Sequence, residues 1–406
     1  MALIVKKFGG SSVATAEKIL QVARRVLKEK EPDDHVVVVV SAMGDTTDNL
    51  ISLAGEIAAE PYHYKREMDM LLTTGEQMSA ALLAMAFNTL GQKAVSLTGA
   101  MAGIKTDSSY TKGKIIYIQP AKVEAALQQG NIVVVAGFQG VDESGDYITL
   151  GRGGSDTSAV ALAGALKADR CEIYTDVEGV YSADPRCVAE AQKMQEITYE
   201  EMLEMARLGA GVMQARSIEV GRKLDVPIHV RSTFSEAQGT MIQSAYTTAL
   251  TSEIRGVAHD AQVAKISVLG ITNQTGAAFK IFSALSAAKI NIDMIVQNVR
   301  DGKNNLTDII FTVADSDVEE AVALVDKIAD EMEAIAVAVA RKVAKVSVVG
   351  AGIAKNPGIA ARIFGVLAKN QIEVDVISTS ETSISCLVKR WEAEKAVQAI
   401  HREFFA

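Results

Sequence analysis

The sequence predicts an α/β protein with a mainly parallel, helix-covered sheet followed by two smaller α/β units. Three observations support this prediction. Continuous runs of β-branched residues, such as 36–40, are typical of strands buried on both faces of a parallel sheet. These runs alternate with segments of helical periodicity, which indicates an α/β domain. Beyond residue 262 the chain repeats itself, and an internal repeat indicates a duplicated unit.

The first domain is expected to alternate strands with helices. Strands are expected in the N-terminal run that ends at Phe8 and at 36–40, 132–136, 171–175 and 227–230. Helices are expected at 14–30, 79–90, 119–129, 157–166 and 199–223. The polar segment 238–252 is rich in Ser and Thr and indicates a domain boundary. We therefore assign 1–244 to this domain, and 245–262 to a linker and a strand that joins the second repeated unit.

Two stretches of sequence mark the repeat. Residues 263–270 (VAKISVLG) match 343–350 (VAKVSVVG), and 292–295 (IDMI) match 374–377 (VDVI). Each copy predicts a βαββαβ pattern, which is typical of a ferredoxin-like unit. We call 263–340 the first repeat and 341–406 the second repeat.

The composition of the chain excludes several classes of function. A formal net charge of −9 over 406 residues argues against nucleic-acid binding. The five His and three Cys show no metal-binding spacing, so no metal site made of protein side chains is expected. No apolar stretch approaches the roughly 20 residues that span a bilayer, and the N-terminus lacks a signal-peptide pattern. These features predict a cytoplasmic protein.

Two glycine-rich stretches are suited to binding phosphate. Lys7 is followed by Gly9, Gly10 and Ser11 at the end of the first expected strand. The turn 151–157 (GRGGSDT) precedes an expected helix, and a helix N-terminus offers N–H groups to an anion. In that turn Arg152 adds a carboxylate clamp. No P-loop motif is present, so any nucleotide binding must use a different cradle.

Three further stretches are candidate parts of a site, although each also has an ordinary structural explanation. The stretch 41–48 follows a buried strand, where ligands of α/β sheets bind. Its polar residues are equally typical of an ordinary turn. Glu76 precedes the helix expected at 79–90, where an acidic residue is favoured by the helix dipole alone. The stretch 174–186 combines Gly, Pro and Tyr in a shaped loop, which need not bind anything.

Taken together, these residues resemble the aspartate kinase family. The stretch 7–13 (KFGGSSV), the turn 151–156 (GRGGSD) and the loop 175–186 (TDVEGVYSADPR) match three of its signatures, and the repeats resemble its paired ACT domains. The resemblance covers essentially the whole chain. It implies an amino-acid kinase fold of the carbamate-kinase type, a parallel-rich α/β sandwich, with two ferredoxin-like ACT units. The implied reaction converts ATP and L-aspartate into 4-phospho-L-aspartate and ADP.

The resemblance also implies roles for individual residues. The transferred phosphoryl group would meet Lys7, and Asp156 would organise Lys7 or the substrate, because a carboxylate nucleophile needs no strong base. The substrate would be bound by Ser41, Thr47, Glu76, Arg152 and Ser155. The nucleotide would be bound by Lys7, Gly9, Gly10, Ser11, Thr175, Asp176, Tyr181 and Arg186. The cosubstrate would be Mg-ATP, with Mg²⁺ held mainly by the nucleotide phosphates.

Regulation is the implied task of the two repeats. Lysine, threonine or both would act as effectors, bound at loops where ACT units pair. The candidate residues are Asn273, Thr275, Gly276, Ala277, Gln297, Asn298, Asn356, Pro357, Ile359, Ser380 and Glu381. Homo-oligomers formed through ACT pairing, and association with a short regulatory-only chain, are the implied assemblies. Because the kinase portion ends near residue 244, we expect ATP binding to survive without the repeats.

One departure from the family pattern leaves alternatives open. Family members commonly carry a Lys in the stretch aligned with 209–213, where this chain has Gly211, so a nucleotide contact is missing or supplied elsewhere. An amino-acid sensor with an inactive kinase domain is therefore one alternative. A kinase of the same fold for glutamate or a nucleoside monophosphate is another, against which Glu76 and Arg152 argue. A nicotinamide-dependent enzyme is disfavoured because no dinucleotide-binding fingerprint follows a strand.

Overall fold

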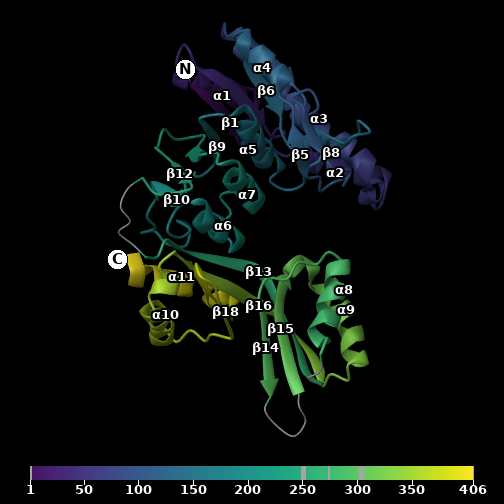
Figure 1. Cartoon of the computed structure of the whole chain (residues 1–406), viewed down its shortest axis with the longest axis vertical. Coiled ribbons are helices and arrows are strands. Elements are labelled where there is room, and N and C mark those ends of the chain that lie inside the picture. The colour runs from purple at the N-terminus through teal and green to yellow at the C-terminus, as the bar shows by residue number, and fades with distance from the viewer. Residues whose placement is uncertain (1, 248–252, 273–274, 301–305, 406) are drawn as a thin grey trace. The chain divides into compact units, whose positions relative to one another are not determined.

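The computed structural model describes residues 2–247, 253–272, 275–300 and 306–405 (Figure 1). As far as these residues extend, the chain forms two compact units. The first unit contains Met1–Val180, Lys193–Ala206 and Gly211–Ala249, and the second contains Tyr181–Gln192, Arg207–Ala210 and Leu250–Ala406. Each unit is described by itself. Among the described helices, none is both long and apolar enough to cross a lipid bilayer.

The first unit is built on a large, mainly parallel sheet. In spatial order its described strands are β10 (Glu196–Thr198), β12 (Thr240–Gln243), β11 (Ile228–Ser232), β9 (Arg170–Thr175), β1 (Leu3–Phe8), β2 (His35–Val40), β6 (Ile132–Ala136) and β3 (Ala94–Leu97). Every neighbouring pair is parallel except β11 and β12. The run Val36–Val40 is almost completely buried, as expected for a strand covered on both faces.

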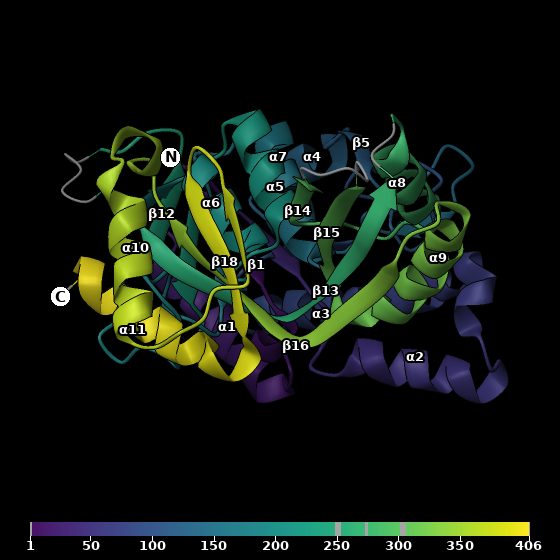
Figure 2. The ribbon, with the colours of Figure 1, turned by 90° about the horizontal axis from the view of Figure 1, so that it is seen from below.

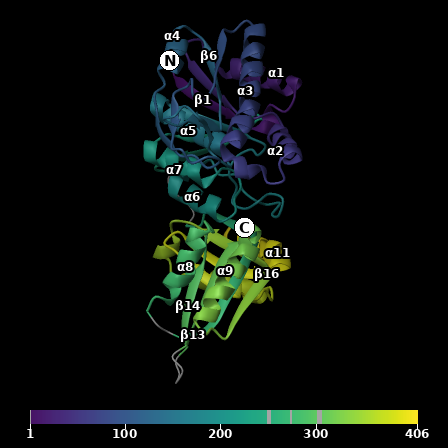
Figure 3. The ribbon, with the colours of Figure 1, turned by 90° about the vertical axis from the view of Figure 1, so that its right-hand side faces the viewer.

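Helices cover both faces of this sheet. The described helices of the first unit are α1 (Ala16–Glu29), α2 (Thr46–Ile57), α3 (Lys65–Thr89), α4 (Ala121–Gln128), α5 (Gly154–Leu166), α6 (Tyr199–Arg207) and α7 (Ala215–Leu224). Figure 3 shows α1 and α3 on one side of β1, and α5 and α7 on the other. The apolar sides of α1 and α3 pack on Phe8, Val38 and Val134 of the sheet. A smaller sheet contains β5 (Ile115–Ile118), β4 (Ile104–Thr106), β7 (Gln139–Val141) and β8 (Tyr147–Thr149).

Two of the expected helices differ from those observed. The expected helix 199–223 is two helices, α6 and α7, because the glycines at 209 and 211 interrupt the helical stretch between them. The helix expected to start at residue 79 is α3, which starts at Lys65. Glu76 therefore lies inside a helix instead of preceding one. Gly75 is tolerated in this helix because a Cβ there would lie 2.9 Å from that of Ala42, so its absence permits a close approach.

The second unit contains one sheet that both repeats share. In spatial order its described strands are β14 (Ile295–Arg300), β15 (Leu306–Ala314), β13 (Gly256–Thr272), β16 (Ala336–Val349), β18 (Ser383–Lys389) and β17 (Val376–Thr379). Figure 2 shows that β13 and β16 are long strands that run through both repeats. Their antiparallel register extends from Gly256 opposite Val349 to Leu269 opposite Ala336. The start of β13 therefore pairs with the second repeat, and the start of β16 with the first.

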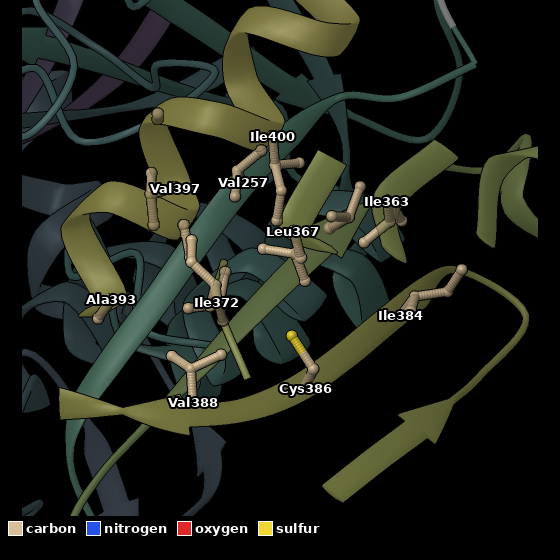
Figure 4. Packing of buried hydrophobic residues seen from close by; sticks show 14 of the residues in the cluster. Val257, Ile363, Leu367, Ile372, Ile384, Cys386, Val388, Ala393, Val397 and Ile400 are labelled. Carbon is tan, nitrogen blue, oxygen red and sulfur yellow. The ribbon is translucent and has the colours of Figure 1, made fainter. Parts of the chain in front are cut away.

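Each repeat has a hydrophobic core of its own. Helices α8 (Ala277–Ala287) and α9 (Val318–Glu331) pack over the first repeat, and α10 (Gly358–Lys369) and α11 (Ala393–Phe405) over the second. Figure 4 shows the second core, in which Val397 and Ile400 of α11 lie near Val257 of β13. Several ion pairs cross between the repeats, and two of them are related by the repeat. Lys265 contacts Asp375 at 2.5 Å, and its repeat counterpart Lys345 pairs with Asp293.

Candidate functional site

The first part of the candidate site lies where the parallel strands β1 and β2 end. Phe8 lies opposite Val40, so the segments that follow these strands run close to each other. The short 3₁₀ helix Gly10–Ser12 follows β1. The Ser41 N–H donates to the Phe8 carbonyl at 3.1 Å, and the Gly44 N–H donates to the Gly10 carbonyl at 3.1 Å. Ligands of open α/β sheets bind at such carboxyl ends of strands.

Lys7 and Asp156 form an ion pair at this edge of the sheet. The Lys7 Nζ lies 2.6 Å from Asp156 Oδ1, and the two side chains are only 11% and 12% exposed. Asp156 lies in the first turn of α5, which begins at Gly154 after Gly153 adopts the left-handed conformation with φ of 69°. A cation, a carboxylate and the N–H groups of a helix start therefore lie together, which suits binding of a phosphoryl group.

Glu76 is a buried carboxyl with an unused oxygen. Its side chain projects from α3 toward the segment after β2, where the Ala42 N–H donates to Oε1 at 3.1 Å. Among the described residues, Oε2 has no hydrogen-bond partner. Only 3% of Glu76 is exposed, and burial raises the pKa of the carboxyl to about 7. An unpaired buried carboxylate is costly, and a cationic ligand group would relieve that cost.

The glycine-rich turn before α5 presents Arg152 at its surface. Arg152 is exposed, and no hydrogen bond or ion pair joins its side chain to another described residue. The carbonyl of Leu150, just before the turn, accepts from Nη1 of Arg216 at 2.8 Å, which anchors the start of the turn. Ser155 is buried in α5, and Thr47 is half-buried in the first turn of α2. Arg152 is therefore placed to contact an anionic ligand, with its charge not neutralised by a partner.

The loop from 175 to 186 is divided between the two units. Thr175 ends β9, and its hydroxyl donates to the Asp176 carboxylate at 2.9 Å. Both residues lie in the first unit. Tyr181 and Arg186 lie in the second unit, where Arg186 contacts Asp184 at 2.7 Å and has an 89% exposed side chain. The sequence motif gave no sign of this division.

Lys6 belongs to a charge network that the sequence analysis did not single out. It faces away from Lys7 because side chains alternate along β1, and its Nζ contacts Glu29 at 2.7 Å and Glu172 at 2.6 Å. Burial acts to raise the pKa of Glu172, but attraction to Lys6 and hydrogen bonds from Lys6 and Arg170 lower it to about 2. The alternation of the strand places Lys6 on the opposite face from Lys7. The network thus ties β1 to β9 and α1 behind the site.

The candidate effector residues lie in the two repeats. Asn273 lies outside the described residues, and Thr275 and Gly276 are exposed just before α8. Gln297 and Asn298 are exposed in β14, an edge strand, and the Gln297 amide donates to the Thr307 hydroxyl at 3.2 Å. Ala277 begins α8 as a buried residue of the first core.

In the second repeat, several candidate side chains already serve the local structure. Asn356 Oδ1 accepts from the Gly358 N–H at 3.0 Å, at the start of α10, and its amide donates to Glu253 at 2.7 Å. The Ser380 hydroxyl accepts from the Ser383 N–H at 2.9 Å in the turn between β17 and β18. Pro357 and Glu381 are exposed, whereas Ile359 is buried in the second core.

Replacing Glu76 with glutamine should stabilise the ligand-free protein at alkaline pH. The folded protein holds the Glu76 proton more tightly than the unfolded chain does, so stability falls as the pH rises from about 4.5 to about 7. Glutamine does not ionise, and it should recover up to about 3 kcal/mol in the free energy of unfolding at pH 8. Thermal unfolding at pH 5 and pH 8 measures this, with the exposed Glu56→Gln as control. An equal difference at both pH values would contradict the prediction.

Comparison with known proteins agrees with the fold. A model of the amino acid kinase family matches residues 2–232, and an ACT domain model matches 266–328 and 346–404. An aspartokinase of Bacillus sp. (strain MGA3) is 46% identical over 404 residues, covering 100% of this chain and 97% of that relative. The chain belongs to the amino acid kinase family, among the aspartokinases.

Solved structures of the family share its architecture. The E. coli aspartokinase III in complex with aspartate and ADP (R-state) gives a TM-score of 0.81 at 24% identity, with each chain covered fully, which shows the shared fold. The same E. coli enzyme in complex with lysine and aspartate (T-state) gives a TM-score of 0.76 at 25% identity, again over the full length of both chains. The α/β fold with two ACT units that the sequence predicts is confirmed.

Proposed function

We propose that this chain is an aspartate kinase that uses Mg-ATP to phosphorylate the side-chain carboxylate of L-aspartate. The products are 4-phospho-L-aspartate and ADP, and the reaction is the first step of lysine, threonine and methionine biosynthesis. The observation that carries this proposal is the Lys7–Asp156 ion pair at the start of α5. Full-length identity of 46% to an aspartokinase supports it. We further propose that the reaction takes place in the cytoplasm.

The chemistry requires positive charge more than proton transfer. A carboxylate oxygen of aspartate attacks the γ-phosphorus of ATP, the bond to the bridging β–γ oxygen breaks, and its electron pair leaves with ADP. No proton moves, so Asp156 is not needed as a base and serves to orient Lys7. Lys7 then stabilises charge on the transferred phosphoryl group in a loose transition state. The Mg²⁺ would be carried mainly by the nucleotide phosphates.

Aspartate would be recognised by its three charged groups. The unpaired oxygen of Glu76 is suited to the α-ammonium, and the exposed guanidinium of Arg152 to the α-carboxylate. The hydroxyls of Ser41, Thr47 and Ser155 would complete this pocket. The side-chain carboxylate of aspartate would then point toward the phosphoryl group at Lys7. On this proposal Glu76→Gln weakens aspartate binding, so a more stable protein is also a poorer enzyme.

The nucleotide would be bound along the ends of β1 and β9. Backbone N–H groups of Gly9, Gly10 and Ser11 would contact its phosphates. From the resemblance to the family, we further propose that the remainder of the nucleotide is bound by Thr175, Asp176, Tyr181 and Arg186.

The proposed function is tested by initial rates of ADP formation with MgATP and aspartate. We expect turnover that saturates with aspartate and is not supported by glutamate or by a nucleoside monophosphate. ATP turnover that is equal with and without aspartate would refute the proposal. Binding of lysine or threonine without any turnover would instead favour the amino-acid sensor.

The ACT repeats would provide feedback regulation by lysine, threonine or both. An effector that binds one pairing of ACT units more tightly than another shifts the enzyme between two states. We propose that the chain forms homo-oligomers through such pairing, and that it can associate with a short regulatory-only chain. The exposed edge strand β14 carries Gln297 and Asn298, and an edge strand offers unpaired backbone groups to a partner.

Replacing Gln297 with alanine should weaken inhibition without changing the basal rate. The exposed amide of Gln297 would contact the effector, and its loss should raise the concentration for half-inhibition about fivefold, as expected for one hydrogen bond. Rates with and without lysine and threonine, added singly and together, measure this effect. Thr312→Val, a buried change in the neighbouring strand β15, is the control for damage to the first repeat. Equal loss of basal activity and inhibition in Gln297→Ala would show that this residue supports the fold.

A further inference from the structure

The segment Tyr181–Gln192 belongs to the second unit, although strand β9, which precedes it in the chain, belongs to the first. The chain lies in the first unit up to Val180 and returns to it at Lys193. Between these points the segment packs within the second unit, together with residues from the second repeat. Ala183 and Val188 are 3% exposed and belong to the same hydrophobic core as Ile400 of α11. The anchoring of this segment is therefore a property of the second unit.

Ser182 is the centre of a buried polar contact in this segment. Its hydroxyl lies 2.8 Å from Nε2 of His401, and both residues are at most 3% exposed. The same hydroxyl accepts from the Gln192 N–H at 2.8 Å, which closes the two ends of the segment on each other. The Ser182 carbonyl accepts from the Val257 N–H of β13 at 2.7 Å. Ser182 thus joins the segment to both the helix and the shared sheet.

The C-terminal helix α11 holds the segment at two further points. The Gln398 amide donates to the Cys187 carbonyl at 2.8 Å, and the Gln192 amide donates to the Phe405 carbonyl at 3.0 Å. Both contacts are exposed, so each contributes less than the buried one. The apolar side of α11, with Val397 and Ile400, is directed into the core (Figure 4). The helix is therefore fixed on one side and carries the segment on the other.

His401 is itself rigidly placed. Its ring stacks on Phe405 with centroids 4.7 Å apart and an interplanar angle of 16°. Burial lowers the pKa of the imidazole, so the ring is neutral at pH 7. A neutral ring forms the contact with Ser182 in either tautomer, because a hydroxyl both donates and accepts. Removal of either partner would leave a buried polar group unsatisfied.

We propose that Ser182 and His401 are positioning residues for ATP. Through their hydrogen bond, α11 of the second repeat fixes the segment that carries Tyr181 and Arg186. This inference rests on the proposed function, in which these two residues bind the nucleotide. Near them the segment and α11 border a cavity of about 590 Å³, which is lined by Arg186, Glu190 and Arg402 among others. The segment is therefore supported at its anchor points and open beside Arg186.

This role gives the second repeat a part in nucleotide binding as well as in regulation. A fragment that ends near residue 244 would lack α11 and the strands on which Ser182 and Val188 pack. If Ser182 and His401 hold the ATP-binding segment in place, ATP binding should weaken when the repeats are removed, contrary to the expectation from the sequence.

The test uses the full-length protein and separates the two substrates. We expect His401→Ala to raise the KM for ATP about fivefold, the change expected for the loss of one hydrogen bond, with the KM for aspartate and kcat within about twofold of wild type. Ser182→Ala should have the same effect, and the double variant should be no worse than either single one. His401→Gln retains a side-chain amide near the position of Nε2 and should restore part of the affinity. Ile400→Val, a change in the same helix that points into the core, is the control for lost stability.

Each outcome decides for or against the inference. An unchanged KM for ATP in both His401→Ala and Ser182→Ala overturns the positioning role. Aspartate-dependent turnover by the wild type would still uphold the proposed function. Parallel rises in the KM for both substrates, matched by Ile400→Val, would show a purely structural role and also overturn the positioning role. If wild type shows no aspartate-dependent turnover, the proposed function fails, and calorimetry with MgATP alone decides the inference. If His401→Ala does not fold, Ser182→Ala, which removes one oxygen atom, gives the answer.

Discussion

Replacing Lys7 with alanine should lower kcat by about 100- to 1,000-fold, with a much smaller change in the KM for aspartate. Lys7 is placed against Asp156 at 2.6 Å in a site that is largely shielded from water. A fixed cation in such a site stabilises charge that develops on the phosphoryl group, and this contribution is made mainly in the transition state. Steady-state rates with saturating MgATP and aspartate measure the loss directly.

The role of Asp156 can be separated from that of Lys7 with a double-mutant cycle. If Asp156 acts only by orienting Lys7, Asp156→Ala should also lower kcat, and the double variant should lose little more than Lys7→Ala alone. Lys122→Ala removes an exposed lysine in α4 and serves as the control for lost positive charge. Additive losses from Lys7→Ala and Asp156→Ala would show that the two residues act independently. A kcat for Lys7→Ala close to wild type would refute the role of Lys7 in phosphoryl transfer.

The fold was largely predictable because continuous runs of β-branched residues indicate its strands in the sequence. The side chains of Val36–Val40 point to both faces of the strand, and all of them are apolar. Both faces therefore have to be buried, as they are in β2. The repeat could be recognised because Lys265 and Lys345 occupy the same place in two similar stretches. Their ion pairs could not be predicted, since each lysine contacts an aspartate of the other repeat. These ion pairs between the repeats depend on how the two repeats share one sheet, and local sequence patterns do not encode that arrangement.

The candidate site was only partly predictable, for related reasons. Lys7 and Asp156 were found because each lies next to a glycine-rich stretch, and such stretches are visible in a single sequence. The raised pKa of Glu76 depends on the burial of α3 against Ala42, which no local pattern reports. Lys6 was missed because an adjacent pair of lysines does not show which one meets buried carboxylates. The link between Ser182 and His401 joins residues far apart in the chain and was equally invisible.

Replacing Arg152 with alanine should raise the KM for aspartate by about 10- to 100-fold. Loss of a hydrogen bond to a charged group typically costs about 1.5–3 kcal/mol, and Arg152 would make a paired contact with the α-carboxylate. The effect should fall on KM more than on kcat, because the α-carboxylate keeps the same charge throughout the reaction. Initial rates over a wide range of aspartate concentrations, at saturating MgATP, measure it.

The comparison with Arg152→Lys makes this prediction specific to the clamp. Lysine keeps the positive charge but cannot form the parallel pair of hydrogen bonds, so its KM for aspartate should lie between those of wild type and Arg152→Ala. The KM for ATP should change little in both variants, because the proposed nucleotide contacts come from other residues. The side chain of Arg152 has no bonded partner among the described residues, so its removal should leave the stability of the fold unchanged. An Arg152→Ala variant with the wild-type KM for aspartate would mean that the α-carboxylate is bound elsewhere, and Glu76 alone would then have to set the orientation of the substrate.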